Sequence, residues 1–265
     1  MTITTLLILI GCGILTNIMS AIFGIGGGVL MVPILHTLFP QFPLQMVAAT
    51  SLTIVIGTAL INLSYFYKQK VKIDVRSLLI WSLGMIVGVQ LGFECSFLLP
   101  DWAIIAVFVV TLVILAIRTW LRKEEPVSKK NQKSDRLQGC FISLFGGGVA
   151  GITGIGGGSI MAPLIGLLPS VKAHQIAAYT NYMMVLGGLG SLYGYLTKTP
   201  TFTLPNSYQI GYVNFSVVAV VVFSSLAASF FSMRLRGMLK PAMVRKLLGG
   251  ILFVIAAYMV AIQFV

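Results

Sequence analysis

Long apolar runs constrain this sequence more than any other feature. Of the 265 residues, 57% are hydrophobic and only 9% are charged, whereas soluble domains carry charge on about a quarter of their residues. Stretches of 18 or more apolar residues recur along the chain, and each can cross a hydrocarbon core of about 30 Å as a helix. Because the runs are continuous rather than alternating, they indicate helices and not barrel strands. The expected fold class is therefore an all-α membrane protein.

The expected elements are eight long spans and two half-helices. Each half-helix follows a glycine-dense stretch and rises only about 18 Å, which is too short for a full crossing. The long spans lie at 3–23, 45–66, 77–99, 102–121, 138–153, 175–196, 210–232 and 243–264, and the half-helices at 28–39 and 158–169. The polar stretch 122–137 is a linker between a first transmembrane repeat, 1–121, and a second, 138–265.

The two halves are internal repeats. The sequence FGIGGGVLMVP at 23–33 recurs as TGIGGGSIMAP at 153–163. The same offset of 130 aligns QMVAATS (45–51) with QIAAYTN (175–181). One gapless offset covers both segments, so chance is a poor explanation. Internal symmetry of this kind is expected of a secondary transporter.

The basic residues indicate how the repeats are oriented. If each glycine run is the bottom of a re-entrant hairpin, 17 of the 18 Lys and Arg residues lie on one side, and only Lys198 lies on the other. Cytoplasmic loops carry an excess of basic residues, so the linker 122–137 is expected in the cytoplasm. Each repeat then has a hairpin and three crossings, and this odd number makes the repeats inverted. The net charge of +12 is read as this topology signal and not as a nucleic-acid surface.

The glycine turns are the expected substrate site. Irregular backbone at membrane depth is tolerated only where it is buried in protein or lines a polar cavity. A short helix that begins at such a turn points its free N–H groups and its positive dipole end at it, so two turns can bind an anion without Lys or Arg. The alternative is that the glycines serve close helix packing. The expected substrate-binding residues are Gly24, Gly26, Gly27, Gly28, Thr50, Ser51, Gly154, Gly156, Gly157, Gly158, Ser159, Thr180 and Asn181.

Three further residues are candidate functional groups. Gln45 and Gln175 occupy equivalent positions and are candidate gate residues, with capping or helix–helix hydrogen bonding as the even alternative. Glu94 is a candidate proton group because intramembrane acids mark ion pathways, although its place near a span end favours an interfacial residue. The chain shows no His/Cys cluster and no Ser–His–acid arrangement, so no metal, cofactor or enzymatic activity is expected.

The paired motifs FGIGGGVLMVP and TGIGGGSIMAP, with QMVAATS and QIAAYTN, resemble the TauE/SafE family. That family groups sulfite and organosulfonate exporters with many uncharacterised membrane transporters. The resemblance covers nearly the whole chain and implies a permease of the bacterial inner membrane that exports sulfite or a small organosulfonate. The residues themselves indicate only an anion. Two alternatives stay open: an anion channel that uses the same half-helix dipoles, and a membrane-embedded assembly partner without flux of its own.

Overall fold

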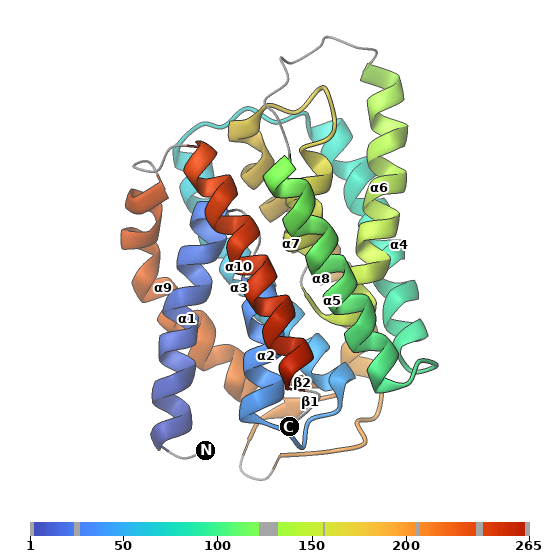
Figure 1. Cartoon of the computed structure of the whole chain (residues 1–265), viewed down its shortest axis with the longest axis vertical. Coiled ribbons are helices and arrows are strands. Elements are labelled where there is room, and N and C mark those ends of the chain that lie inside the picture. Colours follow the sequence, from blue (N-terminus) through green and yellow to red (C-terminus); the bar gives the residue numbers. More distant parts are fainter. Residues whose placement is uncertain are drawn as a thin grey trace.

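The computed structural model describes residues 3–23, 27–121, 132–155, 157–204, 207–236 and 241–262. Within them the chain forms ten helices and one two-stranded ladder (Figure 1). The all-helical expectation is therefore confirmed apart from the ladder. The elements are α1 (Ile3–Phe23), α2 (Gly28–Leu38), α3 (Leu44–Lys68), α4 (Val75–Ser96), α5 (Asp101–Leu121), α6 (Gln132–Thr153), α7 (Gly157–Ile165), α8 (Ala173–Thr197), β1 (Gln209–Ile210), β2 (Val213–Asn214), α9 (Phe215–Arg236) and α10 (Pro241–Ala261).

Two glycines with left-handed backbone angles lie at the helix breaks, one in each of the two glycine-dense motifs. Gly27 immediately precedes α2 and has a φ of 67°, and Gly154 immediately follows α6 and has a φ of 70°. These angles lie in the left-handed region, which glycine enters without the steric cost of a Cβ atom. The short helices α2 and α7 begin directly beyond these breaks, close to where the sequence predicts the half-helices.

Length and hydropathy identify five helices that can cross a membrane among the described residues: α1, α3, α4, α5 and α9. Three more helices have similar lengths, with 22 residues in α6, 25 in α8 and 21 in α10. Helix α6 is less apolar because it starts with QKSDRLQ, and α8 contains several glycines and tyrosines. In α10 the apolar stretch that meets the criterion, Lys246–Ala261, is shorter than 18 residues. The multi-pass character of the chain is thus established, and five of the eight expected spans meet both criteria.

The largest differences from the expected element boundaries occur in three helices. Helix α6 begins at Gln132, inside the stretch 122–137 assigned to the linker. Helix α9 begins only at Phe215, because the residues before it form the antiparallel ladder of β1 and β2. Gly211, with a φ of 55°, lies between the two strands and permits that tight turn. Helix α7 ends at Ile165, four residues earlier than expected.

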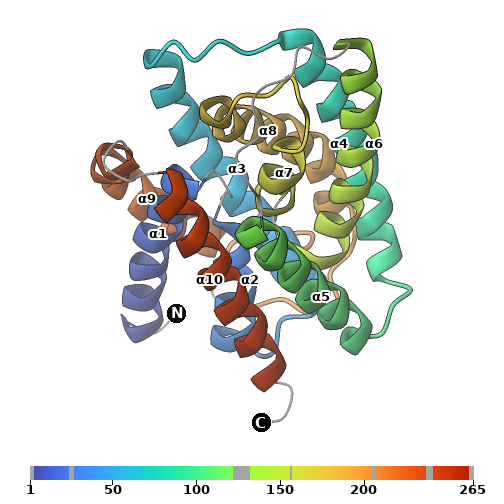
Figure 2. The same cartoon turned by 45° about the horizontal axis from the view of Figure 1, so that its top comes forward.

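Helices from the two halves pair with one another. Helix α1 packs along α9 and α6 packs along α4, while α3 contacts α8 and α5 contacts α10 (Figures 1 and 2). Each of these pairs joins a helix before the linker to a helix after it. The core of the molecule is therefore an interface between the halves rather than two separate cores.

The pair of α4 and α6 packs backbone against backbone. A Cβ atom at Gly88 would overlap the carbonyl oxygen of Leu144, and one at Gly92 would overlap that of Gly148. From the other side, a Cβ atom at Gly151 would overlap the carbonyl oxygen of Val89. Small residues spaced along a helix allow such close approach in membranes. Glycine packing therefore operates here, on α4 and α6.

Candidate functional site

The two glycine turns lie against each other inside the bundle. A Cβ atom at Gly28, the first residue of α2, would overlap the carbonyl oxygen of Ile155 in the second turn. Gly28 and Gly157, the first residue of α7, are both buried. The first N–H groups of a helix have no intrahelical partner, and the positive end of its dipole lies there. The N-terminal ends of α2 and α7 therefore bring partial positive charge into the interior.

Two of the predicted hydroxyl groups lie at the turns. Ser51 Oγ donates to the carbonyl oxygen of Gly28 over 3.3 Å, and Ser159 Oγ donates to that of Ile155 over 3.5 Å. Both serines are fully buried. Three of the predicted site residues, Gly24, Gly26 and Gly156, lie outside the described residues.

The two predicted threonines make different contacts. Thr50 Oγ1 accepts from the backbone N–H of Asn214 over 3.2 Å and donates to the carbonyl oxygen of Tyr212 over 3.5 Å. Thr50 thereby ties α3 to the β-ladder. Thr180 Oγ1 donates to the carbonyl oxygen of Ile176 within its own helix, over 3.0 Å.

Asn181 belongs to a polar cluster that joins α1, α3 and α8. Its Nδ2 donates to the carbonyl oxygen of Ala177 over 2.7 Å, and its Oδ1 accepts from Asn62 Nδ2 over 3.3 Å. Asn62 Nδ2 also donates to Ser20 Oγ over 2.7 Å. Asn62, Asn181 and Ser20 are all 0% exposed. The cluster lies deep in the bundle, and its contacts cross between the halves.

Four residues of this buried polar region were not among the predicted site residues: Thr16, Asn17, Ser20 and Asn62. Thr16 Oγ1, Asn62 Oδ1 and both amide atoms of Asn17 have no hydrogen-bond partner among the described residues. Buried polar groups are normally paired, so unpaired ones need an explanation. The signal was present in the sequence, since three polar residues share one face of the otherwise apolar run 3–23.

A small cavity lies on the side of the second turn. Its volume is about 10 Å³ and its lining includes Gly157, Met85, Met184 and Tyr195. That volume suits a single water molecule. The Tyr195 hydroxyl is fully buried and has no hydrogen-bond partner in the described part of the chain. The two turns therefore differ: the first adjoins a polar region, and the second adjoins a mainly apolar pocket.

The two candidate gate glutamines make the capping and helix–helix hydrogen bonds that were the alternative to a gating role. Gln45 Nε2 donates to the carbonyl oxygen of Ser96 over 3.1 Å, which links α3 to α4. Gln175 Nε2 donates to the carbonyl oxygen of Lys72 over 2.6 Å, and its Oε1 accepts the backbone N–H of Lys172 over 3.0 Å. Gln175 therefore caps α8. A gating role for either residue stays a prediction.

Glu94 lies at the surface rather than in the core. Its carboxylate pairs with Lys198 Nζ over 2.6 Å, and the Glu94 side chain is 57% exposed. The Lys198 ammonium also lies 4.0 Å from the centre of the Phe97 ring. This exposed ion pair fits the interfacial placement, and a proton-carrying role for Glu94 stays a prediction.

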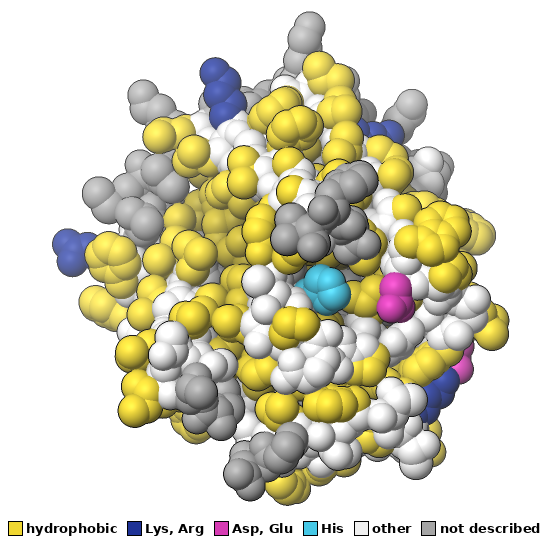
Figure 3. Space-filling view, turned by 60° about the horizontal axis from the view of Figure 1, so that its bottom comes forward, with side chains coloured by type: hydrophobic (Ala, Val, Ile, Leu, Met, Phe, Trp, Pro, Cys, Tyr) yellow, Lys and Arg dark blue, Asp and Glu magenta, His cyan; other side chains and the backbone are white. Residues whose placement is uncertain are grey.

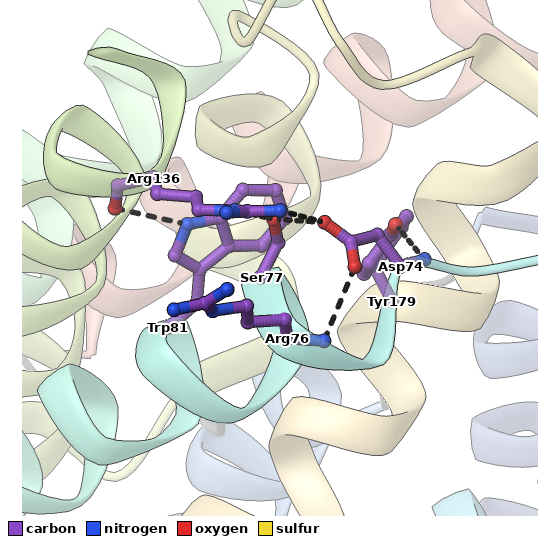
Figure 4. Close-up of polar contacts among 6 residues, drawn as sticks. All are labelled: Asp74, Arg76, Ser77, Trp81, Arg136 and Tyr179. Atoms are coloured by element: carbon purple, nitrogen blue, oxygen red, sulfur yellow. Dashed lines mark hydrogen bonds and ion pairs between the residues drawn. The ribbon is translucent and has the colours of Figure 1, made fainter. Parts of the chain in front are cut away.

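A second ion pair lies at the opposite end of α4 (Figure 4). Asp74 precedes α4, and its carboxylate accepts from Ser77 Oγ over 2.6 Å and from Arg136 Nη2 over 3.2 Å. The Tyr179 hydroxyl accepts the backbone N–H of Asp74 over 2.6 Å. The Ser77 hydrogen bond, followed by the contacts with Arg136, lowers the pKa of Asp74 below its ordinary value. The network ties α4 to α6 and α8.

The described residues contain no group of three or more His, Cys, Asp and Glu side chains placed to hold a metal ion. The three cysteines, Cys12, Cys95 and Cys140, are free thiols. Apart from Asp135, which is 4% exposed, the buried polar and charged side chains of the described residues are the neutral amides and hydroxyls of Asn, Ser and Thr.

The comparisons with known proteins agree in one family. The family described as "Sulfite exporter TauE/SafE" matches residues 9–259. A "Probable membrane transporter protein" of Haemophilus influenzae is 55% identical over 100% of this chain and 99% of its own. A probable membrane transporter protein of Methanocaldococcus jannaschii is 25% identical over 95% of this chain and 94% of its own. A "Sulfite exporter TauE/SafE family protein 5" of Arabidopsis thaliana is 31% identical over 40% of this chain and 23% of its own.

Proposed function

The chain belongs to the sulfite exporter TauE/SafE family and is a membrane transporter, and on this premise we propose that it exports a small anion by alternating access. The anion is sulfite or a small organosulfonate, and the two glycine turns bind it. The chain forms two inverted repeats, each with a re-entrant hairpin and three crossings. The name of the matched family supports a sulfur-containing substrate. The buried N-terminal ends of α2 and α7 support a negatively charged substrate.

The contact between the two turns is the observation that carries this proposal. Gly28 and the carbonyl group of Ile155 approach so closely that no side chain fits between them. Two helix N-termini that begin at buried glycines supply N–H donors and positive dipole ends without any basic side chain. Transporters of several folds hold anionic groups at half-helix N-termini in this way.

The course of the chain supports the inverted arrangement. The start of α1 and the end of α10 lie at the bottom of Figure 1, whereas the end of α5 and the start of α6 lie at the top. Charged side chains are sparse among those visible at the bottom end (Figure 3). With 17 of the 18 Lys and Arg residues expected at the top, the positive-inside rule makes the top end cytoplasmic.

Alternating access needs a closure on each side of the site. The pair of Glu94 and Lys198 joins α4 to the end of α8 at one side. The pair of Asp74 and Arg136 joins α4 to α6 at the other. Both closures link a helix of the first repeat to the second repeat. Movement of one repeat against the other therefore opens one closure while the other stays shut. The lining of the small cavity near Gly157 includes Met85 and Val89, which lie along α4 between Asp74 and Glu94.

Anion flux in proteoliposomes tests the proposal. The full-length protein is reconstituted, and efflux of sulfite, sulfoacetate, thiosulfate and sulfate is compared. We expect saturable flux of at least one sulfur oxyanion, and loss of that flux in Gly28→Leu because the added side chain would overlap the Ile155 carbonyl group and push the two turns apart. Gly250→Leu is the matched control, since a Cβ atom at Gly250 meets nothing within 4 Å.

Two results would contradict the proposal. Normal flux in a correctly inserted Gly28→Leu variant would show that the turns are not the site. Single-channel currents far above carrier turnover, measured in planar bilayers, would show that the protein is an anion channel.

A further inference from the structure

We propose that the unpaired oxygen atoms of Thr16, Asn17 and Asn62 bind one monovalent cation of the size of Na⁺ beside the first glycine turn. This site is separate from the proposed anion site, and nothing in it depends on which anion is transported. The three residues are 0% exposed, and their oxygen atoms have no hydrogen-bond partner in the described part of the chain.

The hydrogen-bond network determines which atom Asn62 presents. The carbonyl oxygen of Ala177 can only accept, so the amide of Asn181 must point its nitrogen there, over 2.7 Å. Asn181 Oδ1 therefore faces Asn62. Because this oxygen can only accept, Asn62 donates to it with its own Nδ2, over 3.3 Å. The second hydrogen of that nitrogen is donated to Ser20 Oγ over 2.7 Å. What remains unpaired on Asn62 is an oxygen, which attracts a cation and repels an anion.

The α1 residues place more oxygen atoms in the same region. Ser20 follows Thr16 by four residues and Asn17 by three, so all three side chains share one face of α1. Ser20 is bonded to Asn62, and a Cβ atom at Gly27 would overlap the side chain of Thr16. The cluster therefore extends from α3 to the first glycine turn. The amide of Asn17 has neither atom engaged and is able to turn its oxygen toward an ion.

The end of α1 adds a favourable field. Helix α1 ends at Phe23, so Ser20 lies in its last turn. The carbonyl groups of a last turn have no intrahelical partner, and the negative end of the helix dipole lies there. Carbonyl groups at the C-terminal ends of broken helices bind Na⁺ in other transporters. The break between α1 and α2 thus offers negative potential on one side and positive potential on the other.

The ligand set favours a monovalent ion. All of the oxygens belong to neutral amides and hydroxyls, whereas Ca²⁺ and Mg²⁺ sites in proteins rely on carboxylates. The described residues contain no cluster of acids that would serve a divalent ion. The offset of 130 also places Gly146, Gly147, Ala150 and Leu192 where the first repeat has Thr16, Asn17, Ser20 and Asn62. The equivalent positions of the second repeat therefore lack the side-chain oxygen atoms that form the site in the first.

Thermal unfolding of the purified full-length protein in the absence of any transported anion tests the site. Chloride is held constant while NaCl, KCl and choline chloride are compared. We expect Na⁺ to raise Tm in a saturable manner, because an ion that binds only the folded state stabilises it. Asn62→Leu should lose this Na⁺ response. Asn17→Asp adds a carboxylate of nearly the same shape and should tighten apparent Na⁺ affinity by about tenfold or more.

The control is Asn214→Ala. Asn214 is a buried asparagine whose amide atoms are both engaged, with Ser207 Oγ and with the backbone N–H of Val217. This variant should have a lower Tm and an unchanged Na⁺ response. If Asn62→Leu does not fold, Asn17→Asp decides the question by itself.

Equal Tm values in the three salts would overturn the proposal and show that the cluster holds only water. An unchanged Na⁺ affinity in Asn17→Asp would also overturn it. Because no transported anion enters the experiment, either result leaves the flux assay and the proposed function standing, and a failed flux assay leaves the cation result standing.

Discussion

Lys198 Nζ lies 2.6 Å from Glu94 Oε2. The two residues belong to different halves of the chain, and their ion pair joins the end of α4 to the residue that follows α8. At the opposite end of α4, Arg136 pairs with Asp74 over 3.2 Å. Helix α4 of the first half is therefore attached to the second half at both of its ends.

Charge reversal tests the closure formed by Glu94 and Lys198. Lys198→Glu places two carboxylates together. We therefore expect the closure formed by Glu94 and Lys198 to open more readily and anion flux to change by about threefold or more. Glu94→Lys combined with Lys198→Glu should restore the wild-type rate. Thermal stability should change little, because exposed ion pairs contribute about 0–1 kcal/mol. Flux in proteoliposomes and Tm are the measurements, and additive effects of the two substitutions would exclude the pair as a closure.

Acid should weaken the network around Asp74. Its pKa is lowered in the folded state, first by the Ser77 hydroxyl and then by Arg136. A carboxyl group with a lowered pKa stabilises the fold above its unfolded pKa of about 3.9, and this stabilisation is lost as the pH falls through the folded value. Asp74→Asn should therefore lower Tm at pH 7 by more than it does below about pH 4. Asp101→Asn, at the exposed start of α5, serves as the control. A Tm difference between wild type and Asp74→Asn that is independent of pH would contradict the assignment.

Gly154→Ala should destabilise the protein. Gly154 has a φ of 70°, and an added Cβ atom would overlap the backbone of Ala48 in α3. We expect a loss of about 1–3 kcal/mol from backbone strain alone. Gly148→Ala, in the helix α6 that Gly154 follows, is the matched control, since the nearest atom to its added Cβ lies 3.8 Å away. Denaturant unfolding compares the two variants, and equal stabilities would show that the second turn relaxes without strain.

The proposed orientation predicts opposite labelling of two exposed loops. In a cysteine-free background, Thr201→Cys should react with an impermeant maleimide added to intact cells. Gln69→Cys should react only after the cells are permeabilised. Both positions are exposed, and they lie in loops at opposite ends of the helices α3 and α8. Labelling of Gln69→Cys in intact cells would invert the topology.

Local features of the sequence were sufficient to predict the helices and the two glycine breaks. The continuous apolar runs predict helices because backbone groups in lipid must be paired within a helix. The breaks at Gly27 and Gly154 follow from the glycine-dense repeats, since only glycine enters the left-handed region without cost. Ser51 and Ser159 could be placed near the turns because they lie close to the glycine motifs in the sequence or one helix away.

The partners of the polar side chains were decided by the tertiary structure. Asn62 meets Asn181 across 119 residues and Ser20 across 42, and no local pattern encodes such separations. Thr50 illustrates the same limit, because its hydroxyl contacts the ladder around Asn214 rather than a glycine turn.

The division has a physical cause. Helix formation and the apolar pattern of a helix depend on residues within one or two turns of each other. The lengths of the helices, the breaks between them and the family motifs can therefore be recognised from consecutive residues. Which amide faces which carbonyl depends on how ten described helices pack together. The sequence by itself determined a helical membrane transporter with two glycine breaks, and the packing of its two halves decided that oxygen atoms of Asn62 and Asn17 are left unpaired beside the first break.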